Sequence, residues 1–257
     1  MILGKKPAEG MELIELRRQK RKRRKARRKL VLLIMLVLTI CIGILFTPLF
    51  NLSEIEIEGN LKLTAEEIIK ASGLVMGENI FKFKLKESGE KISKIPYVNS
   101  IRVERKLPGK IRIEITESIP MAYIPYNDKL IVTDYEGKVL EVKTEKINYA
   151  VPILYDFNLK SFSLGEKINE KDSEKLKKTL EITKNLYNNN LIEKVRSINS
   201  VDGEYFLNIS EKLKITIGDG SDLSAKLVML LEVLKKIPAD AGGLIDARNA
   251  DRVYHRS

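Results

Sequence analysis

The sequence predicts an α+β protein with one N-terminal transmembrane helix followed by two mixed domains, the second built on an extended antiparallel sheet. Three observations lead to this fold class. Residues 30–50 form an uncharged apolar run. Residues 52–117 follow a strand, helix, helix, strand, strand pattern. Residues 121–257 combine short strand-like segments with two amphipathic helices, as expected for a layered α+β domain.

The apolar run from Leu30 to Phe50 has the length of a membrane span. At about 1.5 Å per residue, its 21 residues make a helix of roughly 31 Å, close to the hydrocarbon thickness of a bilayer. The run lacks the polar face of a buried core helix, and the residues around Pro48 lack the small side chains of a signal-peptide cleavage site. We therefore expect an uncleaved anchor, with a core helix and a cleaved signal as the alternatives.

The basic residues are concentrated before this span. Residues 1–29 hold 13 Lys or Arg and 3 Glu, whereas the other 228 residues carry a net charge of +1. Because Lys and Arg beside a span stay on the cytoplasmic side, we expect residues 1–29 to be a cytoplasmic tail and the chain after Phe50 to be extracytoplasmic. The cations expected to set this topology and to contact the lipid surface are Arg17, Arg18, Arg21, Arg23, Arg24, Arg27, Arg28 and Lys29. The nearly neutral exterior argues against nucleic-acid binding, which remains an alternative for the tail alone.

A first external domain is expected over residues 51–119. Its predicted elements are a strand at 53–57, a helix between a capping box at Thr64–Glu67 and a stop at Gly73, a second helix at 84–94, and strands at 98–106 and 110–117. The economical packing of these faces is a small sheet covered on one side by the two helices.

These elements carry a family resemblance. The motifs are Ile55-x-Ile57-x-Gly59-Asn60, Gly77-x-Asn79-Ile80-Phe81, Ile95-Pro96-Tyr97-Val98, Val103-x-Arg105-x-Leu107-Pro108 and Ile111-x-Ile113-x-Ile115-x-Glu117-x-x-Pro120. In their order and spacing they resemble the POTRA domain of the bacterial division family FtsQ/DivIB, and the basic tail and single span stand where that family has them. One departure is Ser118, where the family usually has a basic residue.

Residues 120–257 are expected to form the second domain, which is similar to the C-terminal region of that family. The predicted elements are a meander at 121–124, 130–134 and 139–142, a helix at 171–187, strands at 192–198, 205–209 and 213–217, a helix capped by Asp219-Gly220-Ser221-Asp222, and strands at 243–248 and 252–256. The first helix places Leu176, Leu180, Thr183 and Tyr187 on one side. The second carries an apolar stripe, expected to be core, of Leu223, Leu227, Leu230, Leu231, Leu234 and Ile237.

The exterior offers no evident catalytic set. The single cysteine, Cys41, lies inside the span, and the single histidine, His255, is expected to be a solvated residue near the end of the chain. A Ser/His/Asp triad and a His-based metal site are therefore not expected. The acidic residues Glu54, Glu56 and Glu58 match an exposed sheet face better than an acid/base pair. We expect no enzyme activity, no cofactor and no metal.

The resemblance implies a function for the whole chain. It implies a non-enzymatic scaffold of the plasma membrane at the division septum that binds FtsB/DivIC-like and FtsL-like single-span proteins, contacts other septal proteins, and links early to late division proteins in septal peptidoglycan synthesis. We expect partners to add a strand near the C-terminus, with Arg248, Asn249, Val253 and Tyr254 as the contacting residues. For Tyr254, covering the end of the core is an equal alternative. A POTRA-type binding or chaperone module not dedicated to division and an anchored cell-wall enzyme are the competing functions.

Overall fold

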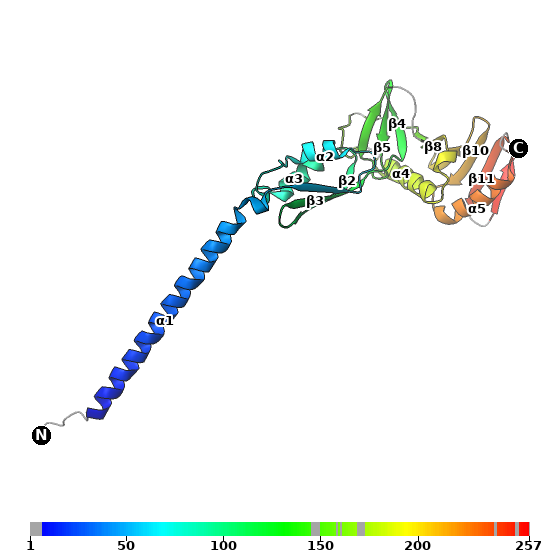
Figure 1. The fold of residues 1–257 in the computed structure, drawn as a ribbon. Coiled ribbons are helices and arrows are strands. Elements are labelled where there is room, and N and C mark those ends of the chain that lie inside the picture. The colour runs from blue at the N-terminus through cyan, green and yellow to red at the C-terminus, as the bar shows by residue number, and fades with distance from the viewer. Residues whose placement is uncertain are drawn as a thin grey trace. The chain divides into compact units, whose positions relative to one another are not determined.

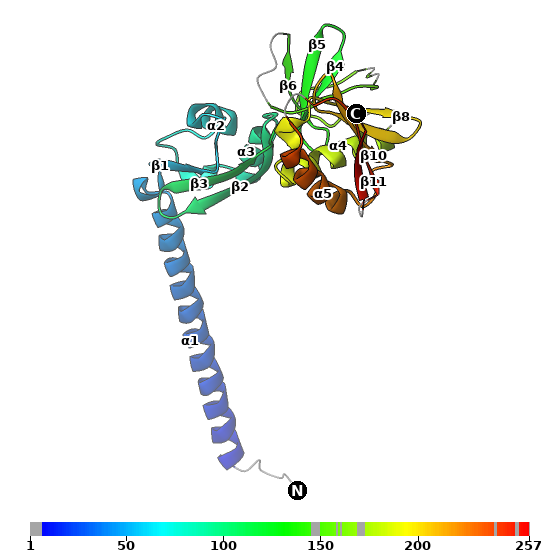
Figure 2. The ribbon, with the colours of Figure 1, turned by 90° about the vertical axis from the view of Figure 1, so that its right-hand side faces the viewer.

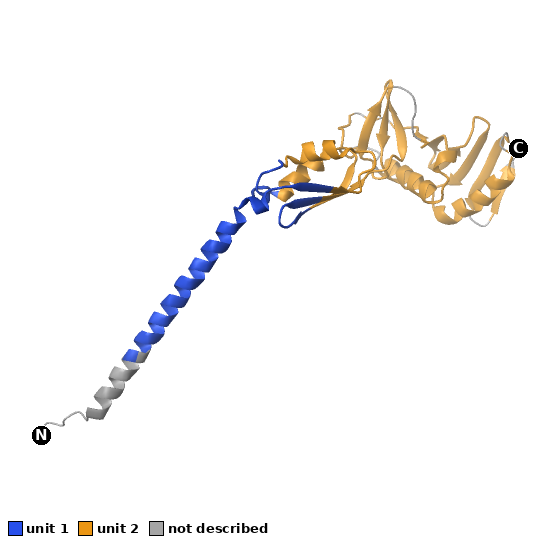
Figure 3. Ribbon diagram, in the orientation of Figure 1, with its two compact units in different colours: residues 1–56, 75–84, 104–112 blue, residues 57–74, 85–103, 113–257 orange. Residues whose placement is uncertain are grey.

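A computed structural model describes residues 7–144, 150–157, 159, 161–168, 173–238, 241–249 and 252–256 (Figure 1). The chain is α+β, as predicted. It divides into two compact units (Figure 3). Unit 1 comprises residues 1–56, 75–84 and 104–112, and unit 2 comprises residues 57–74, 85–103 and 113–257. Both units contain parts of the predicted first domain, so the domain boundaries proposed from the sequence stay predictions.

Unit 1 begins with a single long helix, α1 (Pro7–Leu45), which joins the predicted tail and span without a break. Its segment Lys20–Leu45 is long and apolar enough to cross a membrane, and its side chains are exposed throughout. The expectation that the helix continues to Phe50 is wrong. Thr47 is extended because it precedes Pro48, and Pro48 opens a short 3-10 helix, η1 (Pro48–Phe50). The first six residues of the predicted tail lie outside the described part of the chain.

The next elements follow the predicted strand, helix, helix, strand, strand order. They are β1 (Glu54–Glu58), α2 (Ala65–Ser72), the 3-10 turn η2 (Ile80–Lys82), α3 (Leu85–Ile92), β2 (Val98–Lys106) and β3 (Lys110–Glu117). The three strands form a sheet in the order β1-β3-β2, and Figures 1 and 2 show α2 and α3 on one side of it.

Helix α2 begins and ends where the sequence predicts. The Thr64 side chain accepts a hydrogen bond from the backbone N–H of Glu67, whose carboxylate accepts one from the backbone N–H of Thr64. This reciprocal pair is the predicted capping box. Gly73 ends the helix in the left-handed conformation, with φ 69°. The local signals of the sequence therefore set both ends of α2.

The remaining elements of unit 2 form a second, larger layer of sheet and helix. The strands are β4 (Ala122–Tyr126), β5 (Lys129–Thr133), β6 (Val139–Lys143), β7 (Ile153–Leu154), β8 (Ser197–Val201), β9 (Glu204–Asn208), β10 (Leu213–Gly218), β11 (Gly243–Asn249) and β12 (Arg252–Arg256); the helices are α4 (Ser173–Asn188), η3 (Ile192–Lys194) and α5 (Leu223–Lys236). All nine strands join one sheet in the order β12-β11-β10-β9-β8-β7-β4-β5-β6. The sheet is antiparallel except at β10–β11, β7–β8 and β4–β7, so the expected antiparallel sheet is a mixed one.

The core of this layer contains the apolar stripe predicted for the last helix. Leu223, Leu227 and Leu230 are buried, and the other three members of the stripe pack against the core while partly exposed. In α4, Leu176 and Leu180 point into the same core. The stripe is thus core, as expected from its helical spacing.

Two local predictions are wrong. Residues 192–196 are not a strand, because Asn190 ends α4 in the left-handed region (φ 55°) and the chain makes η3 before β8 begins at Ser197. Asp222 precedes α5 with φ 48° but its side chain makes no capping hydrogen bond. The Asp219 carboxylate accepts a hydrogen bond from the Ser221 N–H in the preceding turn instead.

Of the four residues predicted to share one side of α4, three are buried: Leu176, Leu180 and Thr183. Thr183 is buried, and its hydroxyl donates to the Leu180 carbonyl. Tyr187, in the last turn, is 41% exposed, because its neighbour Leu186 takes the buried position there. Residues 171 and 172, where the sequence predicts the start of this helix, lie outside the described residues.

Candidate partner-binding edge

Strand β12 forms one end of the nine-stranded sheet and lies beside β11. The two strands are antiparallel, with Ile245 opposite His255 and Asp246 opposite Tyr254. Among the described residues, no backbone hydrogen bond from another segment reaches the side of β12 that faces away from β11. This side therefore carries the backbone donors and acceptors that an added strand requires.

The opposite end of the sheet is covered at the start of β6. Segment 165–168 lies along β6, where Val139 donates its N–H to Glu166 and accepts one from Gly165, with N···O distances of 2.9 and 2.8 Å. Lys138 and Lys167 form an isolated antiparallel bridge there. The two ends of the sheet are thus not equivalent: among the described residues, the start of β6 is paired on its outer side, whereas β12 has no such pairing.

Side chains of β12 alternate between the two faces of the sheet. Val253 is half-buried and packs against the core, on the side covered by α5. Tyr254 points to the other face, opposite Asp246, and is 53% exposed. His255 is exposed, and its Nε2 lies 2.8 Å from the carbonyl oxygen of Gly242. It is therefore tied to the start of β11, although the sequence suggested only a solvated residue.

Arg248 is held in place by Asp246. Its Nε and Nη2 donate to the two carboxylate oxygens at 3.0 and 2.6 Å, and its Nη1 lies 3.6 Å from Glu204. The paired carboxylate, together with Glu204, raises the pKa of Arg248, so the guanidinium keeps its charge at any physiological pH. The stem of Arg248 passes over Gly218, where a Cβ would lie 3.3 Å from its Cγ. Gly218 thus leaves room for the arginine to reach across β10.

Comparison with known proteins identifies the family. Residues 50–118 match the sequence model of the POTRA domain, FtsQ-type. The chain is 32% identical to the cell division protein DivIB of Clostridium tetani over 73% of its own length and 71% of that relative. The chain belongs to the FtsQ/DivIB family of cell division proteins. It is also 30% identical to the DivIB of Clostridium acetobutylicum over 77% of both chains, and 33% identical to the FtsQ of Corynebacterium glutamicum over 40% of this chain and 46% of that relative.

Within this FtsQ/DivIB fold, the four residues predicted to contact partners do not form one cluster. Arg248 and Tyr254 lie on the face of the sheet that points away from the core, where Asp246 binds Arg248 and lies opposite Tyr254. Val253 faces the core. Asn249 is exposed beyond a bulge, opposite Arg252. The residue that the sequence analysis missed is Asp246. Its position two residues before Arg248 on a predicted strand places both side chains on one face, and that spacing was a usable signal.

The position at which this chain departs from the FtsQ/DivIB pattern has a structural role. Ser118 is buried, and its hydroxyl donates to the Asp134 carboxylate at 2.9 Å. The other oxygen of Asp134 accepts the backbone N–H groups of Glu136 and Lys138. Ser118 therefore helps to hold the turn between β5 and β6.

The topology residues lie on α1. Arg18, Arg21, Arg23, Arg24, Arg27, Arg28 and Lys29 are exposed on its N-terminal half, and Arg17 lies on the same helix, although its side chain is outside the described part. The helix thus presents a cationic stretch directly before the apolar one, which is the arrangement that favours a cytoplasmic N-terminus.

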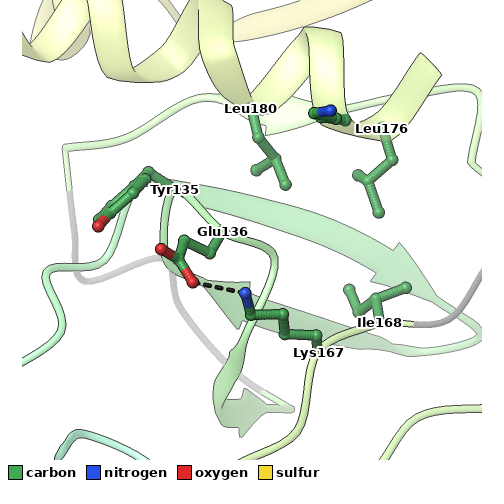
Figure 4. A pocket seen from close by; sticks show the side chains of 7 residues that line it. Tyr135, Glu136, Lys167, Ile168, Leu176 and Leu180 are labelled. Atoms are coloured by element: carbon green, nitrogen blue, oxygen red, sulfur yellow. Dashed lines mark ion pairs between the residues drawn. The ribbon is translucent and has the colours of Figure 1, made fainter. Parts of the chain in front are cut away.

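A hollow of about 330 Å³ lies beside α4 and is lined by charged side chains that could take part in chemistry (Figure 4). Leu176, Leu180 and Ile168 line it, and Lys167 and Glu136 form an ion pair of 2.6 Å at its side. The ammonium lowers the pKa of Glu136 and the carboxylate raises the pKa of Lys167. Both groups stay charged at neutral pH, which does not suit proton exchange with a substrate. No cluster of three or more metal-ligating side chains occurs among the described residues.

Proposed function

We propose that this chain is a non-enzymatic scaffold of the bacterial divisome, anchored by α1 and exposed outside the membrane. It binds FtsB/DivIC-like and FtsL-like single-span partners and links early to late division proteins during septum formation. Its membership in a family of cell division proteins supports the division role. In the proposed topology, the basic half of α1 is cytoplasmic and touches lipid headgroups.

The observation that carries the partner assignment is the open side of β12. A partner segment pairs its backbone with β12 and extends the sheet, while exposed side chains select the partner. Tyr254 offers a large aromatic surface with a polar tip, and Arg248 offers a guanidinium already oriented by Asp246. Segment 165–168 occupies the start of β6, which favours β12 as the end of the sheet for this pairing.

A substitution at Tyr254 tests the side-chain part of this proposal. The full-length chain in lipid nanodiscs is titrated with a purified DivIC-like partner from the same cell. Tyr254→Ala is expected to weaken binding at least about tenfold, because interface tyrosines often contribute 1.4 kcal/mol or more. Tyr187→Ala is the matched control, since Tyr187 is also exposed but lies on α4. Equal affinity of the Tyr254 variant and the unmodified chain would contradict the assignment, provided that their unfolding curves coincide.

Hydrogen exchange tests strand addition itself. Amides of residues 252–256 that face away from β11 are expected to exchange quickly in the free chain and to slow severalfold when the partner is bound. Amides of β6 serve as the internal control and are expected to keep their rates. Binding without any slowing along β12 would show that the partner uses side chains or another surface.

Localisation tests the division role. A fluorescent fusion at the N-terminus of the full chain is expected to form a band at midcell in dividing cells. The same fusion without residues 252–257 is expected to form that band but to lose recruitment of the DivIC-like partner. Uniform membrane signal from a functional full-length fusion would reject the division role and favour a general binding module of the envelope.

A further inference from the structure

Large apolar side chains are exposed where α1 ends. We call Phe46, Leu49, Phe81 and Leu107 the membrane-proximal rim. Their side chains are between 41% and 72% exposed. Phe46 and Leu49 directly follow the helix, whereas Phe81 and Leu107 come from segments far along the chain, and all four belong to unit 1. Clustered apolar exposure of this kind marks an interaction surface rather than ordinary scatter.

The loop that contains Phe81 is bonded to the end of α1. The Asn79 side chain donates to the carbonyl of Leu45, the last residue of α1, at 2.7 Å. The backbone N–H of Leu52 donates to Glu78 and its carbonyl accepts from Gly77, both at 2.8 Å. The Asn79 bond satisfies a carbonyl that the helix end leaves without an intrahelical partner. They keep residues 75–84 next to the end of α1.

The turn between β2 and β3, which contains Leu107, is bonded to the same place. Ser53 donates its backbone N–H to Gly109 at 2.8 Å, and a Cβ at Gly109 would lie 2.5 Å from the carbonyl oxygen of Asn51. The absence of a side chain at Gly109 therefore allows this close approach. Figure 3 shows the three segments of unit 1 gathered at the end of the helix.

Aromatic and cationic groups accompany the rim. The ring of Phe81 lies 5.6 Å from the ring of Phe50. The Arg105 guanidinium lies 5.8 Å from the centre of the Phe81 ring and donates to the carbonyls of Ile80 and Phe83. Lys82 is exposed close by in sequence, and Lys106 is also exposed, with an ion pair of 3.3 Å to Glu104. Aromatic rings and long cations are the side chains that prefer the boundary between acyl chains and headgroups.

We infer that the membrane-proximal rim rests in the phospholipid headgroup layer of the bilayer that α1 crosses. The occupant follows from continuity, because Phe46 is the first residue after the span helix and the other rim segments are bonded within a few residues of that point. The cations match phosphate groups in charge, and the apolar side chains lose water on entering the interface. The contact holds the first domain against the membrane and so limits its rotation about α1. This inference rests on the proposed anchoring by α1.

Site-specific fluorescence quenching tests the inference. The chain has one cysteine, so Cys41→Ser gives a full-length background for single cysteines at Phe81 and Leu107, each labelled with bimane. The protein is reconstituted in vesicles of phosphatidylcholine and phosphatidylglycerol that contain lipids with a nitroxide at the headgroup or along the acyl chain. Labels at 81 and 107 are expected to be quenched severalfold more by the headgroup nitroxide than a label at Val201, an exposed apolar residue of β8 in unit 2.

A label at Leu38 separates this inference from the anchoring on which it rests. It is expected to be quenched by the acyl-chain nitroxide if α1 spans the bilayer. Quenching at 38 with only the Val201 level at 81 and 107 overturns the inference and leaves the anchor intact. No quenching at 38 rejects the anchor as well. Both rim positions are exposed, so the substitutions leave the fold intact.

Discussion

The Arg248 guanidinium and the Asp246 carboxylate form a two-point contact along one strand, with Nε–Oδ1 at 3.0 Å and Nη2–Oδ2 at 2.6 Å. Such a fork geometry orients the guanidinium as well as neutralising it. Because Asp246 lies opposite Tyr254 on β12, the contact places a fixed cation beside the strand proposed to receive a partner.

Asp246→Asn is expected to release Arg248 and to weaken partner binding by about tenfold, roughly 1.4 kcal/mol, because the guanidinium loses its orientation before binding. Calorimetric titration with the DivIC-like partner measures the change. Glu204→Gln is the control, since it removes only the longer contact of 3.6 Å and is expected to change affinity little. Unchanged affinity in the Asp246 variant would show that partner binding does not depend on Arg248 in this orientation.

Glu117 is expected to be a strong stabilising residue of the first domain. Its carboxylate accepts the backbone N–H groups of Leu61, Lys62 and Leu63 at 2.8 to 2.9 Å. Glu117→Ala should lower the free energy of unfolding by about 2 kcal/mol, a typical loss for hydrogen bonds to a charged group. Urea unfolding measures it, with the exposed Glu66→Ala as the control. A loss no larger than that of the control would mean that water replaces the carboxylate at this turn.

Leu227→Ala should destabilise the second layer by about 2 to 5 kcal/mol, because it removes a fully buried side chain from the core between α5 and the sheet. Its neighbour Val228 is 56% exposed, so Val228→Ala should change the free energy of unfolding by less than about 0.5 kcal/mol. Chemical denaturation of the two variants compares buried and exposed positions of one helix. Similar losses in both would contradict the assignment of the stripe to the core.

The loss of folding stability at acidic pH should depend on Glu56. The Arg112 guanidinium donates to this carboxylate at 3.0 Å, and with Lys110 it holds the pKa of Glu56 below its ordinary value of 4.5. A folded-state pKa below the unfolded one stabilises the protein above pH 4.5, and this stabilisation is lost as the pH falls through the folded-state pKa. The stability difference from Glu56→Gln should therefore shrink on acidification. An NMR titration in which Glu56 has a pKa of 4.5 or higher would contradict this.

Local patterns of the sequence determined much of this protein. Alternating polar and apolar residues, bounded by turn residues, predicted the ends of β2 and β3. The capping box and Gly73 predicted both ends of α2. The apolar stripe of α5 predicted its buried face. Each of these signals acts within one or two turns of the chain, where neighbouring residues alone decide the geometry.

Only the tertiary structure decided which backbone remains open. Segment 165–168 pairs with the start of β6, and β12 ends the sheet. Both facts depend on hydrogen bonds between segments far apart in sequence. The same holds for Asp246, which acquires its role when Arg248 folds back onto it and Tyr254 comes to lie opposite. In unit 1, Asn79 reaches the end of α1 only because the loop returns there. Side-chain periodicity reports which face of an element is buried, but not which other element lies beside it.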